Sequence, residues 1–411
     1  MNILLISNTC SKGEFARIQK IKNSEKISPQ QSFFSMLVEG LLEHEEIERV
    51  ICIAVRPIAQ SNSNVDNLVS WNEQISERLS FVYTRIIAKN VRRNMVNFLE
   101  TQRAIRKILQ GNANFNRTNT VAIIDPLAFD LTFGAITALG DIPAIAVVTD
   151  IPMFIGAIGK SSGVVARLKS TLKQWMFKSA INKMDGYCFL TEAMNYINAQ
   201  CKPYCVVEGM VPMTMHPLVR REKSEARVVM YAGGLYEKFG IVNLVEAARG
   251  VFGINFELHL YGEGNCVDYI NQVHGSSPNI IYKGVVGIDE IKEAERNAAL
   301  LINPRPCNEE FTKFSFPSKT LEYMASGRPV LTTKLPGIPA EYFDYVYSIE
   351  DNSVALLRDK LSELLSLSDS VLDEKGALAQ KFVVENKNAK IQVGKIIRML
   401  KGMHNGSLLQ E

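Results

Sequence analysis

The sequence predicts an α/β protein built from two Rossmann-like, doubly wound domains. Its 411 residues exceed the length of one ordinary domain, which is about 100–200 residues. Short apolar runs rich in β-branched residues alternate with helical patterns, as in a parallel sheet covered by helices. The alternation lapses at residues 211–226, where two prolines and a run of charges interrupt it, and restarts at Arg227. We therefore expect one sheet on each side of a boundary near residue 217.

Apolar runs mark the expected strands. In the first half these are residues 3–7, 49–55, 80–83, 121–124, 144–148, 186–190 and 204–207. In the second half they are residues 228–232, 257–261, 280–283, 299–302, 330–333 and 346–348. Apolar residues at three- and four-residue intervals predict helices at 31–42, 94–109, 165–183 and 318–325. The tail 354–401 is predicted to be helical. We expect domains at 1–217 and 218–385, and a C-terminal helix within 386–411 that packs back on the first domain.

Composition places the chain among globular proteins, because 46% of its residues are hydrophobic and 22% are charged. The apolar start breaks at Asn8, which is too soon for a signal peptide. No stretch reaches the ~18 apolar residues that a membrane span needs. We therefore expect a cytoplasmic protein.

The cysteine spacing argues against a disulfide framework and a zinc site, and the net charge argues against a nucleic-acid partner. Seven scattered cysteines predict reduced thiols rather than a disulfide framework. Cys201 and Cys205 are the closest pair, but the further ligands of a zinc site are missing beside them. A net charge of +3 is too small to indicate a nucleic-acid partner.

One stretch has an unusual charge pattern, because no Asp or Glu occurs between Asp150 and Asp185. Its basic residues are Lys160, Arg167, Lys169, Lys173, Lys178 and Lys183. Apolar residues recur among them at helical spacing, namely Leu168, Leu172, Trp175, Met176 and Ile181. A second basic cluster consists of Arg92, Arg93, Arg103, Arg106 and Lys107. The pattern fits an anionic membrane surface as a partner and equally fits a core-packing helix with solvated lysines.

Three elements in the second half carry the candidate chemistry. The first is YAGGLYEKFGIVNLVEA, residues 231–247, in which an apolar strand ends at Gly233 and Gly234 and a helix follows. Adjacent glycines let backbone amides approach an anion at a helix N-terminus. A diphosphate fits this pattern, and so does a tight turn without a ligand. The second element is LYGEG, residues 260–264, at the end of the next strand, where ligands collect in open α/β sheets.

The third element is INPRPCNEEFTKFSFPSKTLEYMASGRPVL, residues 302–331. A strand ends at Asn303, Pro304 and Arg305, a polar loop follows, and a helix then carries Glu322. The Glu322 carboxylate either accepts hydrogen bonds from two vicinal hydroxyls, as a ribose supplies, or is a solvated surface group. The residue pattern leaves both interpretations open.

In this order and spacing, the three elements resemble the donor half of the retaining glycosyltransferases of family 4, the group 1 type, which have the two-domain GT-B fold. The run FPSKTLEYMASGRPVL is similar to that family's helix and following strand, and YAGGLYEKFGI and LYGEG are similar to its phosphate loop and next strand end. The resemblance covers about residues 227–350; in the first domain it is limited to the architecture, the loop 8–13 and the segment VVTDIP. It implies a central cleft between an acceptor-binding domain and a nucleotide-sugar-binding domain.

The resemblance also implies a set of site residues. Glu322 would bind the ribose hydroxyls, and Gly233 with Gly234 would lie against the donor diphosphate. The other donor-side residues are Lys238, Gly262, Glu263, Lys283, Ser315 and Ser318. Gly13 and Asp150 would lie on the acceptor side, where Asp150 either orients the acceptor or caps the next segment. We expect no metal and no other cofactor, because no Asp-x-Asp pair is placed to hold a divalent ion.

The chain departs from this family's pattern at three positions. Phe314 stands where a second glutamate often contacts the sugar, and Gly234 and Phe239 stand where an arginine and a lysine often face the diphosphate. Fixed cations beside developing charge are often the largest catalytic contribution. Other groups should therefore replace them: we expect Arg305 and Lys319 as catalytic cations.

Lys238 is a further candidate cation, whereas Lys313 is assigned to the surface. Glu309 or Glu310 would substitute for the missing glutamate, or the donor sugar is not an ordinary hexopyranose.

The expected function is transfer of a sugar from a UDP- or GDP-sugar to an oligosaccharide or lipid-linked acceptor in polysaccharide or cell-envelope glycan synthesis. The resemblance implies retention of configuration without a metal, in the cytoplasm or peripherally at the inner face of the cell membrane. Two alternatives remain. A non-catalytic partner subunit would explain the three departures, and a nucleotide-sugar epimerase or hydrolase would need catalytic acids and bases that are not identified.

Overall fold

The computed structural model describes residues 1–22, 29–56, 69–85, 92–111, 114–155, 164–213 and 225–404. The chain forms two compact units. Unit 1 comprises Met1–Met210 and Ala389–Glu411, and unit 2 comprises Val211–Asn388. The expected boundary near residue 217 lies outside the described residues.

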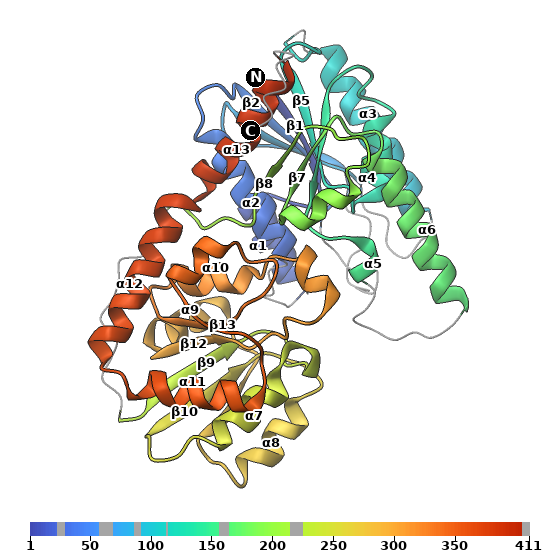
Figure 1. Ribbon diagram of the computed structural model, residues 1–411. Helices are drawn as coiled ribbons and strands as arrows, with labels where there is room; N and C mark the ends of the chain where they lie inside the picture. Colours follow the sequence, from blue (N-terminus) through green and yellow to red (C-terminus); the bar gives the residue numbers. More distant parts are fainter. Residues whose placement is uncertain are drawn as a thin grey trace. The chain divides into compact units, whose positions relative to one another are not determined.

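Unit 1 is built on an eight-stranded sheet in the order β3-β4-β2-β1-β5-β6-β7-β8 (Figure 1). Neighbouring strands are parallel except β3 and β4. The strands are β1 (Asn2–Ser7), β2 (Arg49–Ala54), β3 (Trp71–Gln74), β4 (Leu79–Tyr83), β5 (Thr120–Ile124), β6 (Ala144–Val148), β7 (Gly186–Phe189) and β8 (Tyr204–Val206). Strands β1, β5 and β6 are buried along their whole length, as expected when helices cover both faces of a parallel sheet.

The helices of unit 1 are α1 (Lys12–Lys22), α2 (Pro29–Leu42), α3 (Arg93–Gly111), α4 (Phe129–Ile136), α5 (Pro152–Ile155), α6 (Val164–Ile181) and α13 (Ala389–His404). The sequence pattern does not predict α1 or strand β3. Helix α1 begins where a loop is expected, because Ser11 caps it: the Ser11 Oγ accepts a hydrogen bond from the Glu14 amide at 3.0 Å. Strand β3, WNEQ, lacks an apolar alternation and lies at the edge of the sheet.

Unit 2 is built on a six-stranded sheet in the order β11-β10-β9-β12-β13-β14, with all neighbouring strands parallel. The strands are β9 (Arg227–Ala232), β10 (Phe256–Tyr261), β11 (Ile280–Gly284), β12 (Leu300–Asn303), β13 (Val330–Thr333) and β14 (Tyr347–Ile349). The helices are α7 (Ile241–Arg249), α8 (Val267–His274), α9 (Ile288–Asn297), α10 (Ser318–Ala325), α11 (Val354–Ser366) and α12 (Asp369–Asn386). Two doubly wound units are therefore present, and the predicted fold class is confirmed.

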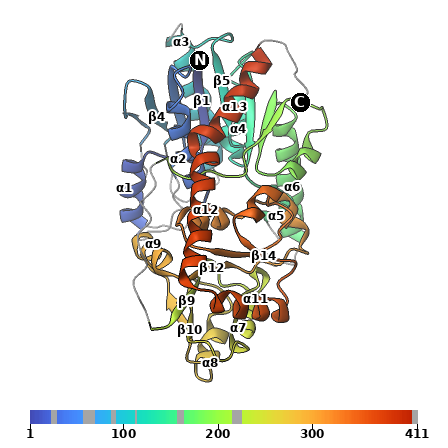
Figure 2. The same cartoon turned by 60° about the vertical axis from the view of Figure 1, so that its left-hand side comes forward.

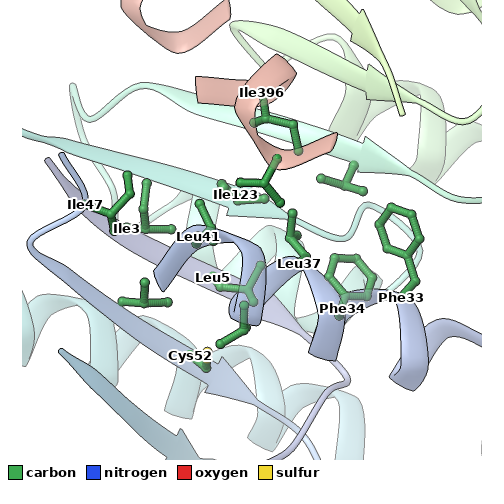
Figure 3. Packing of buried hydrophobic residues seen from close by; sticks show 14 of the residues in the cluster. Ile3, Leu5, Phe33, Phe34, Leu37, Leu41, Ile47, Cys52, Ile123 and Ile396 are labelled. Atoms are coloured by element: carbon green, nitrogen blue, oxygen red, sulfur yellow. The ribbon is translucent and has the colours of Figure 1, made fainter. Parts of the chain in front are cut away.

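Helix α13 returns to unit 1 and completes its hydrophobic core. It packs against α2, as both views show (Figures 1 and 2). Figure 3 shows Ile396 of α13 in one cluster with Leu37 and Leu41 of α2 and Ile123 of β5. The backbones approach closely at Gly40, where a Cβ atom would lie 2.5 Å from the Ala389 carbonyl oxygen.

We predict that Gly40→Ala lowers the free energy of unfolding of unit 1 by about 1–3 kcal/mol, because the added methyl group overpacks this contact. Gly394→Ala on α13 is the matched control. Its Cβ would meet only His44, at 3.5 Å, so the better helix propensity of alanine should leave the stability unchanged or raise it by up to about 1 kcal/mol. Urea unfolding of both variants tests this, and equal effects would contradict the packing described.

Candidate active site

The strand order of unit 2 places the loops after β9 and β12 at a topological switch point. The chain leaves β9 toward β10 on one side, whereas β12 lies on its other side, and ligands bind at such points in open α/β sheets. Backbone contact confirms that the two loops meet. Gly240, with φ of 80°, would bring a Cβ atom 2.0 Å from the carbonyl oxygen of Pro304, so only glycine fits there.

Backbone hydrogen bonds join the glycine loops after β9, β10 and β11. The Gly233 amide donates to the Tyr261 carbonyl at 2.9 Å, and the Gly262 amide donates to the Gly284 carbonyl at 2.8 Å. Gly262 has a φ of 124°, and a Cβ atom there would lie 1.9 Å from the Gly233 carbonyl oxygen. The strand ends of unit 2 are thus held in a fixed relation.

Helix α10 lies against the Gly233 loop. A Cβ atom on Gly233 would lie 2.5 Å from Cε of Lys319, so the lysine side chain crosses the bare glycine. The buried Tyr323 fixes the helix, because its hydroxyl oxygen accepts from the Ala232 amide at 2.9 Å and donates to the Ala232 carbonyl at 3.3 Å. Lys319 therefore lies against Gly233 at the end of β9.

Glu322 is exposed on α10, and a buried carboxyl group lies close enough to respond to its charge. This group is Glu295 on α9, which is only 7% exposed. Burial, together with the charge of Glu322, raises the pKa of Glu295 to about 7, and nearby Lys319 opposes the shift. The three side chains thus share one region. Glu295 was not expected from the sequence, although it occupies an apolar position of the helical pattern Ile288, Ile291, Glu295, Ala298.

Arg305 and Lys238 gather on the ring of Phe239. The Arg305 Cζ lies 4.9 Å and the Lys238 Nζ lies 5.1 Å from the ring centroid. The same ring would be 3.0 Å from a Cβ atom on Gly234, which places both cations beside the glycine loop. Burial, followed by the charge of Arg305, lowers the pKa of Lys238.

The remaining donor-side candidates lie at the margin of this group. Glu263 is exposed and its carbonyl accepts from the Leu235 amide at 2.8 Å. Lys283 is exposed on the edge strand β11, near His259. Ser318 is exposed at the start of α10. The half-buried Ser315 packs its carbonyl oxygen on Gly337, where a Cβ atom would be 2.4 Å away.

In unit 1, the loop after β1 supports a buried ion pair. The sequence Ser11–Glu14 has the form of a capping box, in which the Glu14 side chain would accept from the Ser11 amide. Here the Ser11 amide donates instead to the Tyr83 hydroxyl oxygen at 3.1 Å. The Glu14 carboxylate lies 3.6 Å from the guanidinium of Arg56, and both side chains are buried. Gly13 lies in the exposed first turn of α1 rather than in a loop, with Glu73 3.9 Å from its Cβ position.

A second buried carboxyl group, Asp125, follows β5 at the switch point of unit 1. It accepts a hydrogen bond from the Leu127 amide at 3.0 Å and another from the Gln30 side chain. Burial, assisted by the charge of Asp150, raises the pKa of Asp125 to about 7. Asp150 itself is exposed after β6. Asp125 was not expected from the sequence, although its position directly after an apolar strand marks it as a polar strand end.

Asp125 predicts a dependence of stability on pH. With its pKa raised to about 7, Asp125 keeps its proton in the folded chain up to about that pH, whereas in the unfolded chain it releases the proton near the ordinary aspartate pKa of 3.8. Between these values the folded state binds more protons, so the free energy of unfolding falls by at most about 1.4 kcal/mol per pH unit as pH rises. Asp125→Asn should remove this slope, and Asp141→Asn, at an exposed carboxylate, should keep it. Urea unfolding of unit 1 from about pH 5 to about pH 7 measures the slope; identical slopes in both variants would contradict the burial effect.

Comparison with known proteins agrees with this architecture. Residues 226–366, a span within unit 2 that includes all the donor-side candidates, match the family model described as Glycosyl transferases group 1. Among curated proteins, none matches the sequence.

Solved structures are similar over almost the whole chain. The apo form of the lipopolysaccharide outer core galactosyltransferase WaaB has a TM-score of 0.61 at 9% identity, covering 98% of this chain and 100% of its own. Sucrose-phosphate synthase from Thermosynechococcus elongatus has a TM-score of 0.67 at 11% identity, covering 99% and 100%. HepE from Anabaena, in complex with UDP, has a TM-score of 0.58 at 11% identity, covering 98% and 100%. The chain has the GT-B fold, and the family match with this fold supports a glycosyltransferase.

The described residues lack two features that define other classes of protein. No group of three or more His, Cys, Asp or Glu side chains is arranged to hold a metal ion in this part of the chain. None of the helices described there combines the length and apolar character needed to cross a membrane. None of the seven cysteines, all of which lie among the described residues, forms a disulfide.

Proposed function

We propose that the chain transfers a sugar from a UDP- or GDP-sugar to a glycan or lipid-linked glycan acceptor, with retention of configuration and without a metal. The observation that carries this proposal is the meeting of the glycine loop after β9 with two cationic groups at the switch point of unit 2. Lys319 crosses Gly233, and Arg305 lies over Phe239, which contacts Gly234. A diphosphate is the ligand chemistry that such a combination favours.

The two glycines have different proposed roles. The Gly233 amide already donates to Tyr261, so its contribution is the missing side chain that lets Lys319 cross the loop. The Gly234 amide is proposed to meet a phosphate oxygen of the donor. Glu322, exposed on α10, is proposed to accept hydrogen bonds from the ribose hydroxyls.

Arg305, Lys319 and Lys238 are proposed to replace the two cations that the family pattern places at positions 234 and 239. Arg305 presents a planar guanidinium that can bind two phosphate oxygens at once. Because it lies over the ring of Phe239, its charge reaches the region of the missing lysine. These cations would stabilise the negative charge that develops on the leaving diphosphate.

In the proposed reaction, the acceptor hydroxyl oxygen bonds to the anomeric carbon while the bond from that carbon to the diphosphate oxygen breaks. The hydroxyl proton passes to the leaving diphosphate on the same face. Unit 1 is proposed to bind the acceptor, with Asp150 orienting its hydroxyl groups and Gly13, in the first turn of α1, on the acceptor side. We also propose peripheral association with the inner face of the cell membrane, where a lipid-linked acceptor for cell-envelope or polysaccharide synthesis would reside.

Arg305→Ala and Glu322→Ala should each lower the transfer rate at least about 100-fold, because each removes a charged contact to the donor. Their thermal melts should change little, because Arg305 is only half-buried and Glu322 is exposed. Nucleotide release from a panel of UDP- and GDP-sugars, with and without glycan acceptors, measures the rate.

Lys313→Ala and Glu293→Ala are the matched controls, since both side chains are exposed on neighbouring elements. They should keep the activity. Full activity in Arg305→Ala and Glu322→Ala would refute the assigned roles.

A non-catalytic partner subunit remains the second candidate, because Phe314, Gly234 and Phe239 stand where charged groups are expected. This candidate and the transferase both predict donor binding, which at a hundred times the dissociation constant stabilises a protein by about 2.7 kcal/mol. Only the transferase predicts release of the nucleotide on addition of an acceptor. Donor binding without turnover across the acceptor panel would favour the partner subunit.

A further inference from the structure

Helix α6 exposes an apolar stripe. Leu168, Leu172 and Trp175 follow one another at intervals of four and three residues, and their exposed fractions are 65%, 56% and 64%. This spacing places them on one face of the helix. Lys173 and Lys178 are exposed beside them, and no acidic residue occurs from residue 151 to residue 184. The three side chains of the stripe therefore do not pack in the core, as a core-packing helix would require. Phe177 and Ile181, further along the helix, are buried.

Helix α3 carries a second, shorter stripe of exposed apolar residues. Met95 is 64% exposed and Leu99 is 37% exposed, one helical turn apart. Arg92 is exposed just before this helix, and the helix itself carries the exposed residues Arg103, Arg106 and Lys107. The last three line an open cavity of about 400 Å³. The one acidic residue of α3, Glu100, lies 3.5 Å from Arg85, which offsets its charge.

The two helices belong to one flank of unit 1. Helix α4 packs against both α3 and α6, and Figure 1 shows the three helices gathered on the same side of the sheet. The other side is covered by α2 and α13 (Figure 2). One flank thus presents exposed Met, Leu and Trp side chains interspersed with Lys and Arg.

We propose that this flank, defined by the exposed residues of α3 and α6, docks on an anionic lipid bilayer. Helices that lie in the membrane interface combine Leu and Trp on one face with Lys and Arg beside them. The charge on the flank is complementary to an anionic surface, whereas a second copy of the chain would present the same positive flank and repel it. Indole side chains favour the interface between headgroups and acyl chains, which suits the exposed position of Trp175.

This inference deepens the proposed function, because it names the surface by which the enzyme would reach a lipid-linked acceptor. Its test does not require transfer. Co-sedimentation of the full chain with vesicles of phosphatidylcholine and phosphatidylglycerol should show binding at low salt that weakens as salt screens the charges. Vesicles of phosphatidylcholine alone should bind at least about tenfold less.

Paired substitutions separate the apolar contribution to vesicle binding from the electrostatic contribution. Leu172→Ser with Trp175→Ser should weaken the vesicle binding at least about tenfold, and so should Arg103→Glu with Arg106→Glu. Phe252→Ser and Lys381→Glu are the matched controls in unit 2, where Phe252 is 84% exposed and Lys381 is exposed. These controls should bind vesicles as the parent chain does.

A spectroscopic measurement locates the contact. The chain has two tryptophans, Trp71 and Trp175. In Trp71→Phe, which keeps an aromatic ring beside Tyr83, Trp175 is the only indole, and its fluorescence should shift to shorter wavelength with anionic vesicles.

Three results would overturn the proposal. They are a parent chain that does not bind vesicles, paired variants that bind vesicles as tightly as the parent chain, and Trp175 fluorescence that anionic vesicles do not shift. Lipid-free self-association that the apolar pair of substitutions abolishes would also overturn it, since a second copy would then cover the stripe. A thermal shift with UDP or GDP, measured on the same samples, tests the donor site separately. A failure to bind vesicles therefore does not imply a failure to bind the nucleotide, and the reverse also holds.

Discussion

The close approach of backbones at the strand ends of unit 2 is the constraint on which the donor-side geometry depends. Gly262 and Gly240 each stand where a Cβ atom would lie within 2.0 Å of a carbonyl oxygen in a neighbouring loop. Their positive φ angles close the loops after β9, β10 and β12 onto one another. Lys319 can then cross Gly233 and Arg305 can lie over Phe239. The cationic groups of this site are thus positioned by residues that have no side chain.

Each unit places a buried carboxyl group beside an exposed one. In unit 1 these are Asp125 and Asp150, and in unit 2 they are Glu295 and Glu322. Burial is the main cause that raises the pKa of Asp125 and of Glu295 to about 7, and the neighbouring carboxylate adds to it. The protonation of the buried member therefore sets the charge that surrounds the exposed one near neutral pH.

The sequence predicted the two sheets because parallel strands buried on both faces read as continuous apolar runs. It also predicted helix α10 and the glycine loops from their local patterns. It did not predict β3 or α1, whose formation depends on partners distant in sequence: β3 pairs with β4, and Tyr83 binds the Ser11 amide. Glu295 and Asp125 were missed for a related reason, since burial in the folded chain gives each carboxyl group its unusual pKa. A one-dimensional pattern shows the residue type but not this environment.

Phe239 explains how the chain can lack a lysine at this position without losing positive charge beside the glycine loop. The face of an aromatic ring attracts a cation, and here it holds two: Lys238 from the adjacent position and Arg305 from the end of β12. Burial, followed by repulsion between these two charges, lowers the pKa of Lys238. An anion bound between them would remove that repulsion, so the crowding of Lys238 and Arg305 on one ring is itself a reason for this region to favour a diphosphate. The attraction of each cation to the ring offsets part of the repulsion between them.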